Sequence, residues 1–285
     1  MNDKNLDTVV RFLFENAPVR GAWVNLTQSM QAMPALTSTS IMGKKLLGES
    51  VAAAALLSAN LKLEGRVAIQ ARGNGALRLL VAESTQRAGV RGVVELDATS
   101  VTALNEWVVD GYLAITLLPD HGESYQGIVP LQHARLQDCL ADYFRQSEQL
   151  ETALWLVSDG EHAAGLLLQA MPGARDDDNA WQHLHALAST VRDEELLSLP
   201  CEKLLHRLYH QETVRVFDAE PVNFQCSCSK ERSAAALATL GREELKQLFQ
   251  ETPVVDVDCH FCGKAYQYSE RDIDKILDEI SPTLH

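Results

Sequence analysis

Four of the six cysteines lie close together near the C-terminal end, and they constrain the fold more than any other feature of the chain. Cys226 and Cys228 form one pair, and Cys259 and Cys262 form a second pair after the intervening residues 229–258. Two thiol pairs joined by a loop supply the four sulfur ligands that a tetrahedral zinc ion requires. We predict a zinc site, although cysteine ligands alone leave an iron–sulfur or purely redox arrangement as alternatives.

The chain is long enough for two domains, and its acidic character limits its partners. It has 285 residues, 46% of them hydrophobic, and a net charge of −14. Phosphate backbones repel such a chain, so we expect no nucleic-acid partner.

The N-terminal residues and the apolar runs predict a protein of the cytoplasm. The first ten residues include Asp3, Lys4 and Asp7 and contain no apolar core of a signal peptide. The longest apolar run, 51–57, is too short to cross a bilayer, so we expect no membrane contact. Thiols stay reduced in the cytoplasm, where clustered cysteines indicate metal binding, catalysis or redox sensing.

The pattern of apolar residues predicts an α+β fold: a large N-terminal domain of mixed sheets and helices over residues 1–173. Ser40 is a candidate cap for a helix over 41–61. Asn74-Gly75 between two apolar runs predicts a hairpin. Strands in series with few crossover helices favour α+β over a doubly wound sheet. The expected strands are 67–70, 77–81, 90–96, 112–118, 125–129, 153–157 and 165–171, with a helix near 136–146.

The composition changes at Pro172-Gly173, which are followed by Asp176-Asp177-Asp178. The segment 181–209 is highly charged, has helical spacing and is divided by Pro200. We therefore interpret 174–225 as a linker with marginal, metastable helices and 226–285 as a C-terminal zinc-binding domain. A module of that length has little core of its own, so metal loss should unfold it.

The two remaining cysteines are predicted to be core residues. Cys139 shares one helix face with Leu136, Leu140 and Tyr143. Cys201 precedes leucines at helical spacing, although its place near a helix start leaves a lowered pKa and a redox role open.

Thiolate ligands are also the groups that oxidants attack, so such a cluster can act as a switch. The spacing by itself favours a permanent zinc knuckle over a switch.

The chain resembles the heat-shock protein 33 family, the redox-regulated bacterial holdase chaperones. The resemblance covers most of the chain, in the order that the family has. The segments that carry it are 142–150, 165–172, 204–210 and 224–232, together with Cys259-His260-Phe261-Cys262.

The resemblance implies an ATP-independent chaperone, not an enzyme, whose reduced form binds one Zn²⁺ per chain through Cys226, Cys228, Cys259 and Cys262. Oxidation would pair Cys226 with Cys228 and Cys259 with Cys262, release zinc and unfold the linker. The activated protein would form a homodimer and bind unfolding client proteins under oxidative and heat stress.

Two other function classes are weighed against this expectation. A zinc-ribbon nucleic-acid-binding protein fits the cysteines but not the charge, since residues 221–285 carry seven Lys and Arg against eleven Asp and Glu. A thiol–disulfide oxidoreductase would place Cys259-x-x-Cys262 between a strand at 254–257 and a helix. That alternative leaves Cys226 and Cys228 unexplained.

Overall fold

The computed structural model describes residues 7–36, 39–61, 64–85, 89–97, 103–171 and 178–272. Its contacts divide the chain into two compact units, Met1–Gln225 and Cys226–His285. The expected change of domain at 173–174 lies outside the described residues.

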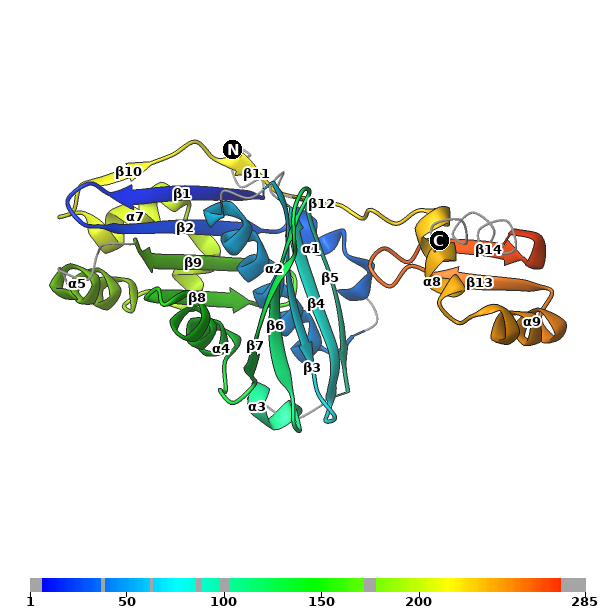
Figure 1. Ribbon diagram of the computed structural model, residues 1–285. Helices are drawn as coiled ribbons and strands as arrows, with labels where there is room; N and C mark the ends of the chain where they lie inside the picture. The colour runs from blue at the N-terminus through cyan, green and yellow to red at the C-terminus, as the bar shows by residue number, and fades with distance from the viewer. Residues whose placement is uncertain are drawn as a thin grey trace. The chain divides into compact units, whose positions relative to one another are not determined.

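The first unit contains two six-stranded sheets (Figure 1). The first sheet has the order β10-β1-β2-β9-β8, with β11 also pairing with β1, and its pairs are antiparallel. Its strands are β1 (Thr8–Phe14), β2 (Val19–Leu26), β8 (Thr152–Ser158), β9 (Ala163–Ala170), β10 (Val214–Val216) and β11 (Glu220–Pro221). The sequence predicted β8 and β9 and missed β1 and β2.

The second sheet has the order β12-β5-β4-β3-β6-β7, antiparallel except for the short pair β12–β5. The predicted hairpin is confirmed, because β3 and β4 pair antiparallel on either side of Asn74-Gly75. The strands are β3 (Gly65–Arg72), β4 (Leu77–Thr85), β5 (Gly89–Leu96), β6 (Tyr112–Pro119), β7 (Tyr125–Pro130) and β12 (Asn223–Phe224).

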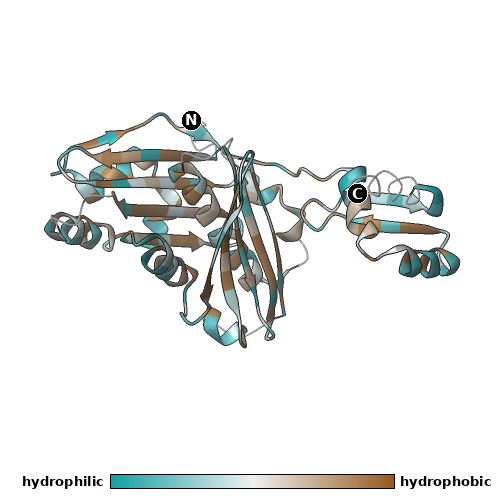
Figure 2. Ribbon diagram, viewed as in Figure 1, coloured by the Kyte–Doolittle hydropathy of each residue, from teal (hydrophilic) through white to brown (hydrophobic). Residues whose placement is uncertain are grey.

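Helix α2 (Ile41–Asn60) contacts strands of both sheets and forms the centre of the first unit. Its start is confirmed, since the Ser40 side chain accepts a hydrogen bond from the Gly43 N–H at 3.2 Å. From Leu46 to Leu57 nearly every side chain is buried, as expected for a helix enclosed on all sides. Figure 2 shows hydrophobic residues running along the strands of the surrounding sheets.

The segment predicted to be a helical linker forms three helices, which pack against the first sheet. They are α5 (Asp178–Ala188), α6 (Asp193–Ser198) and α7 (Cys201–Tyr209), and α7 begins directly after Pro200 as predicted. Their buried side chains join one apolar cluster with Phe14, Trp23 and Leu166 of the sheet. The helices contribute Leu184, Ala188, Leu196, Cys201, Leu204, Leu205, Leu208 and Tyr209 to this cluster.

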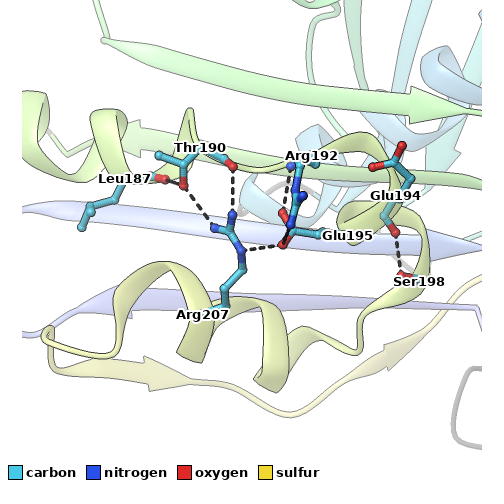
Figure 3. Close-up of polar contacts among 7 residues, drawn as sticks. All are labelled: Leu187, Thr190, Arg192, Glu194, Glu195, Ser198 and Arg207. Carbon is cyan, nitrogen blue, oxygen red and sulfur yellow. Dashed lines mark hydrogen bonds and ion pairs between the residues drawn. The ribbon is translucent and has the colours of Figure 1, made fainter.

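Polar contacts tie α7 to α6 and to the turn that follows α5 (Figure 3). Arg207 Nε donates to Glu195 Oε1 at 2.6 Å, and its Nη2 donates to the Thr190 carbonyl at 3.0 Å. Glu195 also accepts from the Arg192 backbone N–H at 3.1 Å, which caps α6. Asn25 of β2 donates to the Leu197 carbonyl at 3.0 Å and so fixes α6 to the sheet.

The predicted helix near 136–146 is present but changes type. Helix α4 (Leu136–Tyr143) is followed by a π-helical turn, Phe144–Glu148, which ends at Gln149 with φ 54°. The other short helices of this unit are α1 (Gln28–Gln31), a 3₁₀ turn at Pro34–Leu36, and α3 (Leu104–Trp107). Mixed sheets and helices confirm the α+β class.

Among the described residues, the second unit contains helices α8 and α9 and one antiparallel hairpin, and residues 270–272 after the hairpin are helical as well. Ser229 caps the first helix by accepting from the Arg232 N–H at 3.2 Å. The elements are α8 (Lys230–Ala238), α9 (Arg242–Glu251), β13 (Val254–Asp258) and β14 (Ala265–Ser269). Its core consists of Ala234, Leu245, Phe249, Tyr266 and Tyr268.

Candidate metal centre

The structure brings the four clustered cysteines to one point. Their sulfur atoms all lie within 4.8 Å of one another, and each residue is half-buried. Cys226 Sγ is 3.6 Å from Cys259 Sγ, and Cys228 Sγ is 3.4 Å from Cys262 Sγ. All four are free thiols, because a disulfide requires about 2.05 Å between its sulfurs.

Local backbone geometry positions each pair. Cys259 and Cys262 lie in the turn between β13 and β14, where Gly263 adopts a φ of 69° that favours glycine. Gly263 N–H donates to the Cys259 carbonyl at 2.7 Å, and Cys259 N–H donates to the Lys264 carbonyl at 3.0 Å. These bonds close a tight knuckle that turns both sulfurs to the same side.

The first pair is fixed by the start of α8. Cys228 is followed at once by the capping residue Ser229, and Arg232 of α8 donates to the Ser227 carbonyl at 2.7 Å. The short Cys-x-Cys segment is therefore held at both its middle and its end.

A tyrosine on β14 reaches the cluster, and the sequence analysis did not identify it. The Tyr266 hydroxyl donates to Cys228 Sγ at 3.1 Å. Two residues along the same strand, the Tyr268 hydroxyl donates to the Lys230 carbonyl at 2.6 Å. The sequence does not show which of the two tyrosines reaches the cysteines, since both lie on the same face of β14 and are buried in the core of the second unit.

The surroundings shift the pKa values of Cys226, Cys228 and Cys262 in different directions. The Tyr266 hydrogen bond lowers the pKa of Cys228 to about 7. Burial raises the pKa of Cys226, although the Cys228 backbone amide opposes this change. Burial also raises the pKa of Cys262 to about 12. The pKa of Tyr266 is raised because its hydroxyl proton is held by the Cys228 sulfur.

The donor set fits a tetrahedral metal ion. Four sulfurs at 2.3 Å from a central ion would lie about 3.8 Å apart, close to the two sulfur–sulfur distances given above. The Tyr266 hydroxyl supplies the outer-shell hydrogen bond that metal ligands commonly receive. The cluster could therefore hold a metal ion.

The other two cysteines stay in the first unit, as predicted. Cys139 is 0% exposed in α4, and Cys201 is 7% exposed at the start of α7. Burial raises the pKa of both thiols, that of Cys201 to about 12. The sequence left open a lowered pKa for Cys201 at a helix start. That expectation is wrong, because the loss of hydration on burial outweighs the effect of the helix dipole.

The geometry does not fit the oxidoreductase alternative. The strand expected at 254–257 is present as β13, but Cys259 and Cys262 are followed by β14. A redox-active Cys-x-x-Cys pair normally lies between a strand and a helix.

Comparison with known proteins gives a consistent result. The sequence pattern of the family described as Hsp33 protein matches residues 7–269. The 33 kDa chaperonin of Shewanella frigidimarina is 42% identical over 94% of this chain and 95% of its own. That of Shewanella oneidensis is 42% identical over 95% of each chain.

The fold is shared with a protein of known structure. The crystal structure of the 33 kDa chaperonin from Thermotoga maritima aligns with a TM-score of 0.80 at 20% identity, covering 96% of this chain and 99% of that one. None of the helices in the described ranges combines the length and the apolar content that a membrane crossing requires.

Proposed function

The chain belongs to the Hsp33 protein family, and we propose that it is a redox-regulated, ATP-independent holdase that binds unfolding proteins during oxidative and heat stress. The observation that carries the proposal is the cluster of four sulfurs within 4.8 Å. Its regulation, its clients and its cytoplasmic location belong to the proposal, as do the absence of an enzymatic activity and of a nucleic-acid or membrane partner.

In the reduced form, Cys226, Cys228, Cys259 and Cys262 would hold one Zn²⁺. Bound zinc supplies cross-linking of two chain segments and a field that keeps the thiols ionised. Structural zinc sites contribute about 10–16 kcal/mol to folding. The core of the second unit comprises five buried residues among those described, so it depends on that contribution.

Oxidation would remove the ligands. Each pair of zinc-bound thiolates gives up two electrons and forms one disulfide, while one hydrogen peroxide takes up those two electrons and two protons from solvent and is reduced to two waters. We assign the pairs as Cys226–Cys228 and Cys259–Cys262, which rests on the family resemblance. All four sulfurs lie close enough together that distance alone does not select a pairing.

Loss of the second unit would then release the preceding linker. Helices α5, α6 and α7 have 11, 6 and 9 residues, and isolated helices of this length are marginal in water. Their release would expose the leucine-rich cluster that they form with the first sheet. Exposed apolar surface binds unfolded chains, and we propose that activated chains also form a homodimer through it.

The test compares variants before and after peroxide at elevated temperature, with suppression of client aggregation as the assay. We expect wild-type protein to suppress aggregation only after oxidation. Cys262→Ser should bind zinc weakly and lose the dependence on oxidant, whereas Cys139→Ala should behave as wild type. Suppression by oxidised protein that still holds its zinc would refute the mechanism.

A further inference from the structure

Strand β8 is an end strand of the first sheet, and α4 packs beside it. No strand pairs with the outer edge of β8 among the described residues. The Leu156 N–H points outward and donates to Gln137 Oε1 of α4 at 3.1 Å. Because backbone groups two residues apart face the same way, the N–H and carbonyl of Leu154 also point outward.

A groove of about 310 Å³ follows this edge, between α4 and α5. Residues of α4, of β8 and of α5 line it, and Figure 1 shows α4 beside β8. The volume is enough for one long side chain together with a short stretch of extended backbone.

Three aromatic rings contact one another in the wall of the groove. The His185 ring lies between the indoles of Trp155 and Trp181, with centroid distances of 5.4 Å and 5.8 Å. All three side chains are half-buried. Indole faces attract cations, and Arg is the side chain that most often uses this interaction.

The charge of the groove is acidic. Asp138 of α4 and Glu151, which precedes β8, line it with exposed carboxylates. Neither carboxylate forms an ion pair within the part of the chain that the structure describes. The lining contains no Lys or Arg to balance them.

We propose that this groove binds an extended polypeptide segment through one Arg or Lys side chain. The segment's backbone would pair with the outer edge of β8, as in strand addition, and would take over the Leu156 N–H from Gln137. The basic side chain would lie against Trp155 and Trp181 with its charge facing Asp138 and Glu151.

Binding in this groove occurs in the reduced protein and needs no zinc release, so it is separate from the redox-regulated activity. Trp181 and His185 belong to α5, so the groove exists only while this helix is docked. A ligand that binds only the docked state stabilises it. A basic segment in this groove should therefore slow release of the linker during oxidation.

The test uses the full, reduced, zinc-loaded chain and two nine-residue peptides of alternating Thr and Val. One peptide carries a central Arg and the other carries citrulline, which keeps the shape and removes the charge. We expect saturable binding of the Arg peptide by calorimetry and about tenfold weaker binding of the citrulline peptide. Hydrogen exchange should slow at the Leu154 amide when the Arg peptide is bound.

A double variant, Asp138→Asn with Glu151→Gln, should bind the Arg peptide about fivefold or more weakly than the wild type does. The matched control, Asp120→Asn with Glu123→Gln, removes two exposed charges from the turn between β6 and β7 and should bind as wild type. Equal binding of the two peptides, no binding, or an equal loss in both double variants would overturn the proposal. These outcomes leave the redox mechanism untouched, because no oxidation step is involved.

Discussion

Replacing Tyr266 by Phe removes one hydroxyl and keeps the ring in the core of the second unit. The lost hydroxyl donates to Cys228 Sγ at 3.1 Å and is the largest cause of its lowered pKa. Without it the pKa of Cys228 should rise from about 7 toward the ordinary value of 9.0. At pH 7 the ionised fraction of this thiol would fall from about one half to about 1%.

The change in the ionised fraction of Cys228 sets the size of the expected loss of zinc affinity. Because a metal ligand must lose its proton, the ionised fractions set an upper limit of about 50-fold on the loss of zinc affinity at pH 7. Outer-shell substitutions typically cost about 10–100-fold, so we expect a loss of about 10–50-fold. As the pH rises past 9, most of the Cys228 thiol becomes ionised in both proteins, and the difference should shrink.

The assay is competition for zinc with a chromophoric chelator at pH 7 and above pH 9. Tyr268→Phe is the matched control, since it removes a hydroxyl from the same strand that donates to the Lys230 carbonyl instead of a sulfur. It should keep zinc affinity within about twofold of wild type at both pH values. Wild-type affinity in Tyr266→Phe, or an equal loss in Tyr268→Phe, would refute the reasoning.

Three further predictions follow from buried groups in the first unit. Leu204 is 0% exposed, so Leu204→Ala opens a cavity under α7 and should lower the free energy of unfolding by about 2–5 kcal/mol. The loss should appear as a lower urea midpoint and as faster activation by peroxide. Substitution of an exposed residue of the same helix, Glu202→Ala, should change neither. The His133 hydrogen bond lowers the pKa of Asp142, so its contribution to stability is present above the unfolded pKa and is lost as pH falls through the lower folded value. Asp142→Asn should therefore destabilise the protein at pH 7 and matter little near pH 2, as measured by unfolding at each pH. Cys139 and Cys201 should resist iodoacetamide in the native protein because burial raises their pKa. Mass spectrometry of the labelled chain will check this. Rapid labelling of either thiol would contradict the prediction.

Local signals in the sequence predicted much of the first unit. Helix α2 follows from Ser40 and a long run without a helix breaker, and the β3–β4 hairpin follows from Asn74-Gly75. Strand β2 was missed because packing on both faces of the sheet removes the alternation that marks a half-buried strand. Strand β1 keeps that alternation in its burial from Val10 to Phe14, but the apolar Leu13 hides it in the sequence. The π-helical turn after Tyr143 replaces the expected continuation of a helix, and no local pattern in the sequence marks it.

The candidate site was predicted through its ligands and not through their surroundings. Cysteine spacing identified all four sulfurs, since close pairs on a joining loop converge on one point. The hydrogen bond from Tyr266 depends on how β14 pairs with β13, which sets the strand's place beside Cys228. The raised pKa of Cys201 depends on burial against the sheet, which likewise comes from tertiary contacts.

Bound zinc and free thiols, counted in one sample before and after peroxide at elevated temperature, test the central claim most directly. We expect one zinc and six free thiols per chain in the reduced protein. After oxidation we expect no zinc and only the thiols of Cys139 and Cys201. Retention of zinc after the four clustered thiols have disappeared, or loss of zinc with all six thiols still free, would contradict it.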